Sequence, residues 1–184
     1  MNFMELFGDK SNEIFNGDLD ISDKKLTSLK GCYKEINGNL NCSNNKIKSF
    51  KYFPKILKNL NCSLNEIKSF KYCPEVKGNF DCSNNNIKSF KYCCKKINGY
   101  FNVSGNKIKS FKYCPEIKGD FYCSYNNITS FEYCPNIKNK FYCQVNKIKS
   151  LEYAKYSKDF YSDFSQYEYE KYIKPLYPQH FIWF

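Results

Sequence analysis

The amino-acid sequence predicts a mainly β repeat solenoid: a right-handed coil of seven turns, with a parallel sheet on its concave face and little helix. The first observation behind this prediction is repetition. The segment of residues 39–50, NLNCSNNKIKSF, returns almost unchanged at residues 59–70 and 79–90, and in diverged form up to residue 151. The second observation is that apolar residues keep their places in every copy, and the third is that one asparagine does so too.

The spacing of the copies supports real structural units. They begin at residues 18, 39, 59, 79, 100, 120 and 140, so the period is 20 or 21 residues. The two longer spacers are those in which the usual proline is missing, at Tyr33 and Cys94, and each has one extra residue before its isoleucine. Composition and length therefore change together, as expected if each copy is one turn of a coil.

Apolar residues two positions apart predict a short strand with one buried face in each turn. Parallel pairing of these strands would stack the turns about 4.8 Å apart. Two further apolar columns follow the turn after the strand and are expected to fill the core. The four columns are Leu19, Leu40, Leu60, Phe80, Phe101, Phe121 and Phe141; Ile21, Cys42, Cys62, Cys82, Val103, Cys123 and Cys143; Leu26, Ile47, Ile67, Ile87, Ile108, Ile128 and Ile148; and Leu29, Phe50, Phe70, Phe90, Phe111, Phe131 and Leu151.

An asparagine column is expected to be structural. A strand that bends sharply leaves backbone N–H and C=O groups unpaired, and a carboxamide can pair with both kinds. The predicted ladder is Asn45, Asn65, Asn85, Asn106, Asn126 and Asn146, with Lys24 in its place in the first turn. On the other side of the coil, prolines such as Pro54 and Pro74 favour extended or irregular backbone, because a period this short leaves little room for a helix.

These motifs carry a resemblance to a known family. The pattern Leu-x-Cys-Ser-x-Asn-x-Ile, followed by Ser-Phe-Lys-Tyr-Cys-Pro, resembles leucine-rich-repeat proteins of the short-repeat class. It is similar to the repeats of bacterial effectors and to the lysine- and asparagine-rich leucine-rich-repeat proteins of large DNA viruses and phages. The resemblance covers about residues 17–155, although cysteine and phenylalanine stand where leucine is usual. It implies a non-catalytic binding protein, and a viral protein is one possible origin; the ubiquitin-ligase domain of some bacterial relatives is not carried over.

The extent of the repeats divides the chain into three parts. Residues 1–16 are predicted to form an N-terminal cap, residues 17–155 the seven-turn solenoid, and residues 156–184 an aromatic C-terminal cap or tail. The two ends of a solenoid expose core and need covering. The alternative for the C-terminus is that residues 178–184 form a docking peptide, since exposed aromatic residues are costly without a partner.

Composition argues against several functions. The formal charge is +11, but all 29 basic residues are lysine, whereas phosphate and base recognition favours the bidentate fork of arginine. The eleven cysteines include no Cys-x-x-Cys pair, and His180 is the only histidine. The sequence therefore predicts no catalytic, cofactor-binding or metal-binding residues. With no signal peptide or membrane span recognised, we expect free thiols and a cytoplasmic protein, in the host cytoplasm if viral.

The expected function is protein–protein interaction through the concave face, by a protein that is expected to be monomeric. The N-terminal half of this face is polar, while the C-terminal half gathers tyrosines, which are common in binding hot spots. The candidate partner-binding residues are Tyr100, Tyr122, Tyr125 and Tyr142, with repeat drift as the alternative explanation. The alternative function is electrostatic binding of nucleic acid or an anionic surface through convex lysine rows, such as Lys48, Lys68, Lys88, Lys109 and Lys149.

Overall fold

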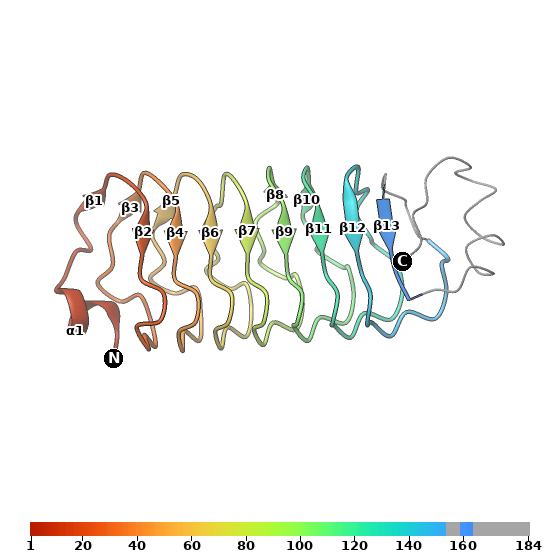
Figure 1. Ribbon diagram of the computed structural model, residues 1–184, viewed down its shortest axis with the longest axis horizontal. Coiled ribbons are helices and arrows are strands. Elements are labelled where there is room, and N and C mark those ends of the chain that lie inside the picture. The colour runs from red at the N-terminus through yellow and green to blue at the C-terminus, as the bar shows by residue number, and fades with distance from the viewer. Residues whose placement is uncertain (154–158, 164–184) are drawn as a thin grey trace.

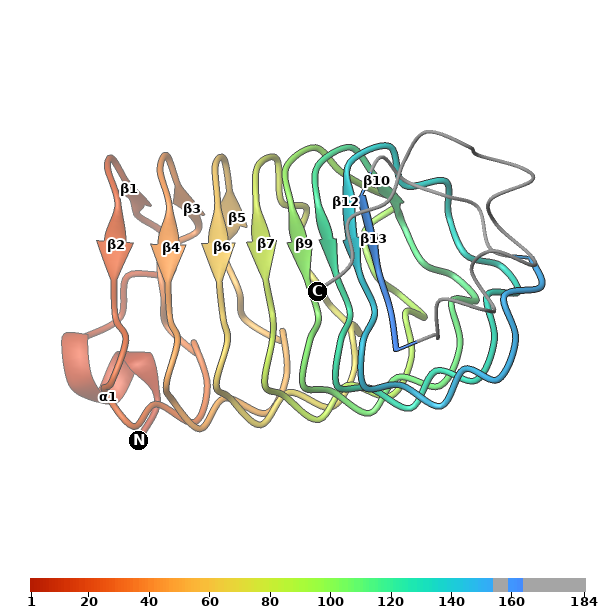
Figure 2. The ribbon, with the colours of Figure 1, turned by 45° about the vertical axis from the view of Figure 1, so that its right-hand side comes forward.

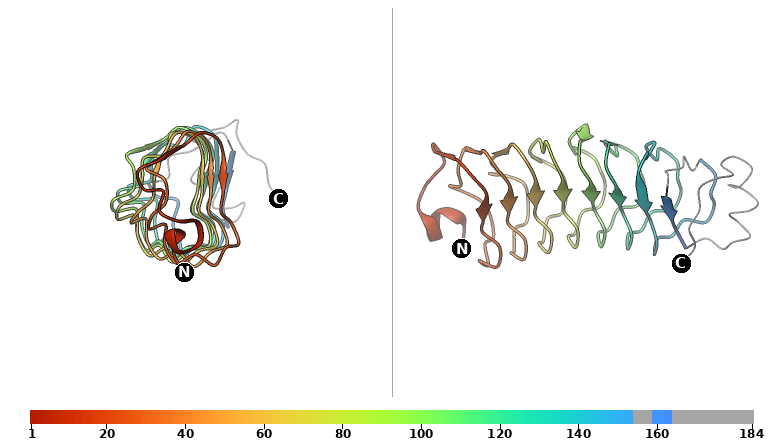
Figure 3. Two further views of the ribbon diagram at one scale, coloured as in Figure 1. Left: turned by 90° about the vertical axis from the view of Figure 1, so that its left-hand side faces the viewer. Right: turned by 45° about the horizontal axis from the view of Figure 1, so that its top comes forward.

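The computed structural model describes residues 1–153 and 159–163 of the chain. It confirms the predicted β-solenoid: successive turns stack along one axis, with parallel strands and a single short helix in the described residues (Figures 1 and 2). A view along this axis shows that the turns superimpose as one coil wound around a shared interior (Figure 3). The molecule is therefore a rod whose surface consists of equivalent positions repeated turn after turn.

One side of the rod is an eight-stranded parallel sheet, called the long sheet below. Its neighbouring strands pair in register, so that Leu40 lies opposite Leu19 and Leu60, as the repeat predicts. In spatial order its strands are β2 (Leu19–Asp20), β4 (Leu40–Asn41), β6 (Leu60–Asn61), β7 (Phe80–Asp81), β9 (Phe101–Asn102), β11 (Phe121–Tyr122), β12 (Lys140–Tyr142) and β13 (Asp159–Tyr161).

The proline side of the coil also pairs, in two short parallel ladders. The first contains β1 (Ile14–Phe15), β3 (Glu35–Ile36) and β5 (Lys55–Ile56), and the second contains β8 (Lys96–Ile97) and β10 (Glu116–Ile117). The sequence predicted only extended or irregular backbone on this side. The ladders form because each turn directs one apolar residue inwards at this side, a fifth buried column of Ile36, Ile56, Val76, Ile97, Ile117 and Ile137.

Phenylalanine rings form the centre of the core. Rings from the same column stack between turns: Phe50 and Phe70 have centroids 6.0 Å apart and planes 8° apart, and Phe101 and Phe121 have centroids 5.9 Å and planes 12° apart. Rings from different columns meet edge to face, as Phe50 does with Phe80 at 6.1 Å. Both arrangements are favoured by the charge distribution of an aromatic ring. A period of 20 or 21 residues thus brings identical side chains into direct contact.

A tight turn with an unusual residue follows the last core phenylalanine of each repeat. In the second repeat, Phe53 N–H donates to Phe50 C=O at 3.0 Å, and Tyr52 in between has φ of 73°. Such a turn normally places glycine at this position. The first repeat does so with Gly31, at φ of 81°, whereas Tyr72, Tyr92, Tyr113, Tyr133 and Tyr153 repeat the tyrosine. The exposed tyrosines of this row hold a backbone conformation that costs free energy.

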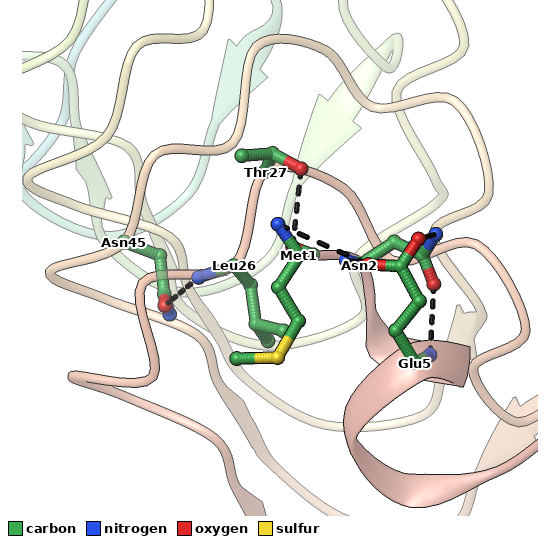
Figure 4. A network of polar contacts seen from close by, with 6 residues as sticks. All are labelled: Met1, Asn2, Glu5, Leu26, Thr27 and Asn45. Atoms are coloured by element: carbon green, nitrogen blue, oxygen red, sulfur yellow. Dashed lines mark hydrogen bonds and ion pairs between the residues drawn. The ribbon is translucent and has the colours of Figure 1, made fainter.

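The N-terminal residues cover the first turn. Helix α1 (Phe3–Phe7) begins with a capping box, in which Glu5 N–H donates to Asn2 Oδ1 at 3.0 Å and Asn2 N–H donates to Glu5 Oε2 (Figure 4). Thr27 N–H donates to Met1 C=O at 2.9 Å, which joins the start of the chain to the first turn. Phe3 is buried in the core. Gly31 allows this approach, because a Cβ there would lie 2.5 Å from the Cβ of Met4.

At the other end, the long sheet continues past residue 155. Strand β13 pairs in register with β12, so that Phe160 stands beside Phe141 and Tyr161 beside Tyr142. Phe160 is buried like the phenylalanines before it. The repeat pattern thus persists into the segment that the sequence assigned to a cap. Residues 156–158 and 164–184, which include the docking peptide considered for residues 178–184, lie outside the described residues.

The stacked rings lead to a prediction about stability. We expect Phe101→Ala to reduce the free energy of unfolding by about 3–5 kcal/mol, because it removes a fully buried ring and leaves a cavity in mid-rod. Urea denaturation followed by circular dichroism would measure the change. The control is Tyr113→Ala, which removes an exposed ring. A loss as small as that of the control would contradict the proposed role of the ring stack.

Candidate functional site

Asparagine side chains join each turn to the next. In the third rung, Asn85 Oδ1 accepts a hydrogen bond from Ile67 N–H of the preceding turn at 2.9 Å. Its Nδ2 lies within hydrogen-bond distance of three carbonyl oxygens, those of Cys62 at 3.0 Å, Cys82 at 3.2 Å and Ser83 at 3.1 Å. The same pattern of backbone acceptors and donors is found at all six positions, Asn45, Asn65, Asn85, Asn106, Asn126 and Asn146.

This arrangement makes the asparagines part of the framework. The first five are at most 8% exposed, so their carboxamides are not available to a ligand. Asn45 serves the first turn, where it accepts from Leu26 N–H at 2.8 Å (Figure 4) and from Lys24 N–H at 3.1 Å. The backbone N–H groups of the first turn are thus paired by Asn45 of the second turn, although the first turn has Lys24 at the asparagine position. The ladder fixes the spacing of the turns and the positions of the side chains on the long sheet.

The N-terminal half of the long sheet's outer face uses its polar side chains internally. Asn59 N–H donates to Asn39 Oδ1 at 3.1 Å, and Asn79 N–H donates to Asn59 Oδ1 at 2.6 Å. In the adjacent column, Asn61 Oδ1 accepts from both the backbone N–H and the hydroxyl of Ser63, at 3.0 and 2.8 Å. These contacts pair many of the side-chain groups that a partner would otherwise bind.

The C-terminal half of the same face is aromatic. Tyr122 and Tyr142 stack with ring centroids 4.8 Å apart and planes 7° apart, and Tyr100 meets Tyr122 edge to face at 6.2 Å. Tyr161 continues the stack, 4.3 Å from Tyr142 with planes 2° apart. We call Tyr100, Tyr122, Tyr142 and Tyr161 the tyrosine patch. Tyr161 is not among the tyrosines predicted from the sequence, because it lies beyond the apparent end of the repeats. The Asp-Phe-Tyr segment of residues 159–161 nevertheless resembles the Lys-Phe-Tyr segment of residues 140–142.

Tyr125 lies apart from the patch. It occupies the bend after strand β11, with φ of 55°, and its side chain is 64% exposed. Among the ring contacts of the described residues, none joins Tyr125 to another tyrosine. The structure therefore brings together three of the four tyrosines that the sequence singled out, adds Tyr161, and places Tyr125 at the border of the face.

The hydroxyls of Tyr122 and Tyr142 stay protonated well above neutral pH. Desolvation, as the main cause, and a hydrogen bond to Tyr161 raise the pKa of Tyr142 to about 12. Desolvation and the nearby carboxylate of Asp120 raise the pKa of Tyr122, whose hydroxyl donates to Asp120 Oδ2 at 3.2 Å. Because the single proton of the Tyr122 hydroxyl is used in this bond, its oxygen is left to accept a hydrogen bond from a partner.

A second regular surface lies at the tyrosine turns. Lysine ammonium groups sit over the rings that follow them, with Lys51 4.8 Å from the centroid of Tyr52 and Lys91 5.0 Å from that of Tyr92. Close to the C-terminal half of the rod, four lysines border one shallow cavity of about 460 Å³. Its lining residues are Lys88, Lys107, Lys109 and Lys147, with Asn127 and Thr129. No acidic side chain lines this cavity, so its charge is positive.

The described residues offer no metal site in the form of three or more histidine, cysteine or acidic side chains around one point. No helix among them combines the length and apolar character needed to cross a bilayer. The eleven cysteines are free thiols, and most are buried in the core. Burial raises the pKa of the strand cysteines, such as Cys62 and Cys82, so that they pack as small apolar groups.

No protein-family model, no curated protein and no solved structure matches the chain. The assignment of a function therefore depends on the geometry of the chain itself.

Substitution of a ladder asparagine is expected to destabilise the protein more than substitution of a surface asparagine. We expect Asn85→Ala to destabilise the protein by about 2–3 kcal/mol, because Ile67 N–H and several buried carbonyls lose their partner. Denaturant titration would measure the change. The matched control is Asn98→Ala, at an exposed side chain that makes one hydrogen bond of 3.3 Å. Equal stability of the two variants would show that the ladder does not hold the turns together.

Proposed function

We propose that the chain is a non-catalytic binding protein of the leucine-rich-repeat class, and that its tyrosine patch on the long sheet contacts a partner protein. The observation that carries the proposal is the contrast between the two halves of one face. In the first half, side-chain polar groups pair with one another and with the backbone. In the second half, large aromatic rings stand side by side on the long sheet. Rigid aromatic area loses little conformational entropy on binding.

The orientation of the rings favours a protein over other partners. Tyr142 stacks between Tyr122 and Tyr161, so both faces of its ring are covered. Nucleobases bind to aromatic residues mainly by stacking on an open face. A protein surface can instead pack apolar side chains against the ring edges and donate hydrogen bonds to the hydroxyl oxygens. The patch suits contacts of the second kind.

The class assignment rests on the repeat. Its length of 20 or 21 residues, its short strand in each turn and its buried asparagine after the strand are the features on which the resemblance depends. A reducing compartment such as the cytoplasm is part of the proposal, and the eleven free thiols support it.

The second candidate function is electrostatic binding of a nucleic acid or another anionic surface. The observation that favours it is the cavity bordered by Lys88, Lys107, Lys109 and Lys147, which contains no carboxylate. Lysine rows on adjoining turns extend this positive region along the rod. Binding of this kind releases counterions and weakens steeply as salt is added.

The main proposal is tested by affinity capture from a native extract with three proteins: the wild type, Tyr122→Ser/Tyr142→Ser, and Tyr72→Ser/Tyr92→Ser. The last variant is the matched control, since it removes two exposed tyrosines from the turns on another side of the rod. We expect the wild type and the control to retain the same protein at low and high salt. Loss of a central aromatic pair should weaken binding by about 2 kcal/mol or more, which is roughly thirtyfold. Retention of that protein by the patch variant would disprove the role of the patch.

The second candidate predicts a different result. If the lysine cavity binds polyanions, fluorescence anisotropy of a labelled oligonucleotide should show an affinity that falls steeply between 50 and 200 mM salt, roughly a thousandfold or more if six or more phosphates are contacted. The Lys88→Gln/Lys107→Gln/Lys109→Gln variant should bind more weakly and with a shallower salt dependence. An equal affinity of this variant and the wild type would rule the cavity out.

A further inference from the structure

Cys93 and Cys94, two adjacent cysteines in the spacer of the fourth repeat, differ from the core cysteines in their surroundings. Cys94 stands where neighbouring repeats have a proline, such as Pro74 and Pro115, in one of the two longer spacers. Its sulfur lies 3.9 Å from that of Cys93, and both sulfurs are within hydrogen-bonding reach of Cys73 in the preceding turn. All three residues are partly exposed, unlike the cysteines of the strand columns. A cluster of three cysteines is thus formed across two turns.

Hydrogen bonds within this cluster divide the roles of the three thiols. The thiols of Cys73 and Cys93 donate to the sulfur of Cys94, and the backbone N–H of Val76 in the preceding turn also points at it. These bonds favour the thiolate and lower the pKa of Cys94 well below its usual value. Desolvation keeps the pKa of Cys73 and of Cys93 raised, so these two remain protonated donors. A thiolate is the form of cysteine that attacks disulfides.

The cluster opens on a cavity of about 440 Å³. Its wall contains Cys73, Cys93 and Cys94 together with Lys95, Lys96 and the single carboxylate of Glu75. Lys96 lies 3.8 Å from Glu116, which is on the next turn, and Lys95 forms no ion pair with another described residue. The wall therefore carries excess positive charge beside the sulfur atoms. A small molecule can reach the thiols there, and an anionic one is favoured.

We propose that this cluster is a thiol–disulfide exchange site for small anionic disulfides, with Cys94 as the attacking residue and Cys73 as the resolving residue. In the first step the Cys94 thiolate attacks one sulfur of the small disulfide, forms a mixed disulfide and releases the other half as a thiolate. In the second step the sulfur of Cys73 attacks the Cys94 sulfur and releases the second half, and the proton of Cys73 passes to a released thiolate. The Cys94 thiolate and the Cys73 thiol together lose two electrons, and the small disulfide is reduced to one thiol and one thiolate.

Geometry selects Cys73 over Cys93 as the resolving residue. Cys93 and Cys94 are consecutive and joined by a trans peptide, which holds their Cα atoms about 3.8 Å apart. Unstrained disulfides need Cα atoms about 4.4–6.8 Å apart. Cys73 lies on the adjacent turn, where its equivalent is Cys93, and Cys94 is one residue further along the chain. With stacked turns about 4.8 Å apart and consecutive Cα atoms about 3.8 Å apart, the Cα atoms of Cys73 and Cys94 are expected roughly 6 Å apart, within the range for a disulfide. A disulfide between Cys73 and Cys94 would cross-link two turns of the solenoid.

The test uses the full-length protein, oxidised glutathione as the anionic disulfide, and digestion after lysine. This digestion separates the relevant cysteines into residues 72–77, 92–95 and 113–118, the last containing Cys114, a partly exposed thiol outside the cluster. At pH 6 we expect residues 92–95 to acquire glutathione at least about tenfold faster than residues 113–118, because only Cys94 has a lowered pKa. A disulfide joining residues 72–77 to residues 92–95 should follow. Equal rates, or an adduct that never resolves, would overturn the proposal.

Two variants and a second reagent sharpen this experiment. Cys73→Ser keeps a hydrogen-bond donor beside Cys94, so the adduct should form and then persist, whereas Cys114→Ser should behave as the wild type does. Release of glutathione from the Cys73→Ser protein at the wild-type rate would refute Cys73 as the resolving residue. Cystamine, a cationic disulfide, should react more slowly than oxidised glutathione beside Lys95 and Lys96. A faster reaction with cystamine would refute the preference for anionic disulfides.

Discussion

The structure depends on pairing the backbone groups that each turn of the coil would otherwise leave unsatisfied in its interior. A buried asparagine solves this problem once per turn, since one oxygen and one amino group reach N–H and C=O groups of two successive turns. Unpaired polar groups in a low-dielectric interior are costly, so the carboxamide sets which residues lie over one another. The stacked phenylalanines, the paired strands and the two candidate surfaces all follow from that alignment.

The asparagine ladder aligns the turns, so that equivalent positions of successive turns lie beside one another on one face of the rod. A change of residue type along one column therefore changes the chemistry of that face within a few turns. The outer column of the long sheet passes from asparagine and aspartate at β4, β6 and β7 to tyrosine at β11, β12 and β13. The polar residues are used to pair the sheet's own groups, whereas the aromatic residues stack. A single sheet thus presents two surfaces of different chemistry.

A departure from the regular repeat gives Cys94 surroundings that differ from those of the strand cysteines. The spacer of the fourth repeat has lost its proline and gained a residue, and Cys94 takes the place of that proline, beside Cys73 of the preceding turn at one cavity wall. The strand-column cysteines, such as Cys62 and Cys82, instead face inwards and take the place of leucine in the core, where desolvation keeps them protonated. Position within the turn, and not residue type alone, decides whether a cysteine acts as an apolar group or as a reactive one.

The sequence by itself determined the solenoid, its parallel strands and which columns face inwards, because a period repeated seven times averages out local ambiguity in each copy. It did not determine the second set of ladders, the stacking of Tyr161 on Tyr142, or the separation of Tyr125 from the patch. These features depend on the path of the backbone between the repeated segments and on side-chain directions at its bends. Only the tertiary structure fixes such distances, since residues 19 to 21 positions apart become neighbours when the turns stack.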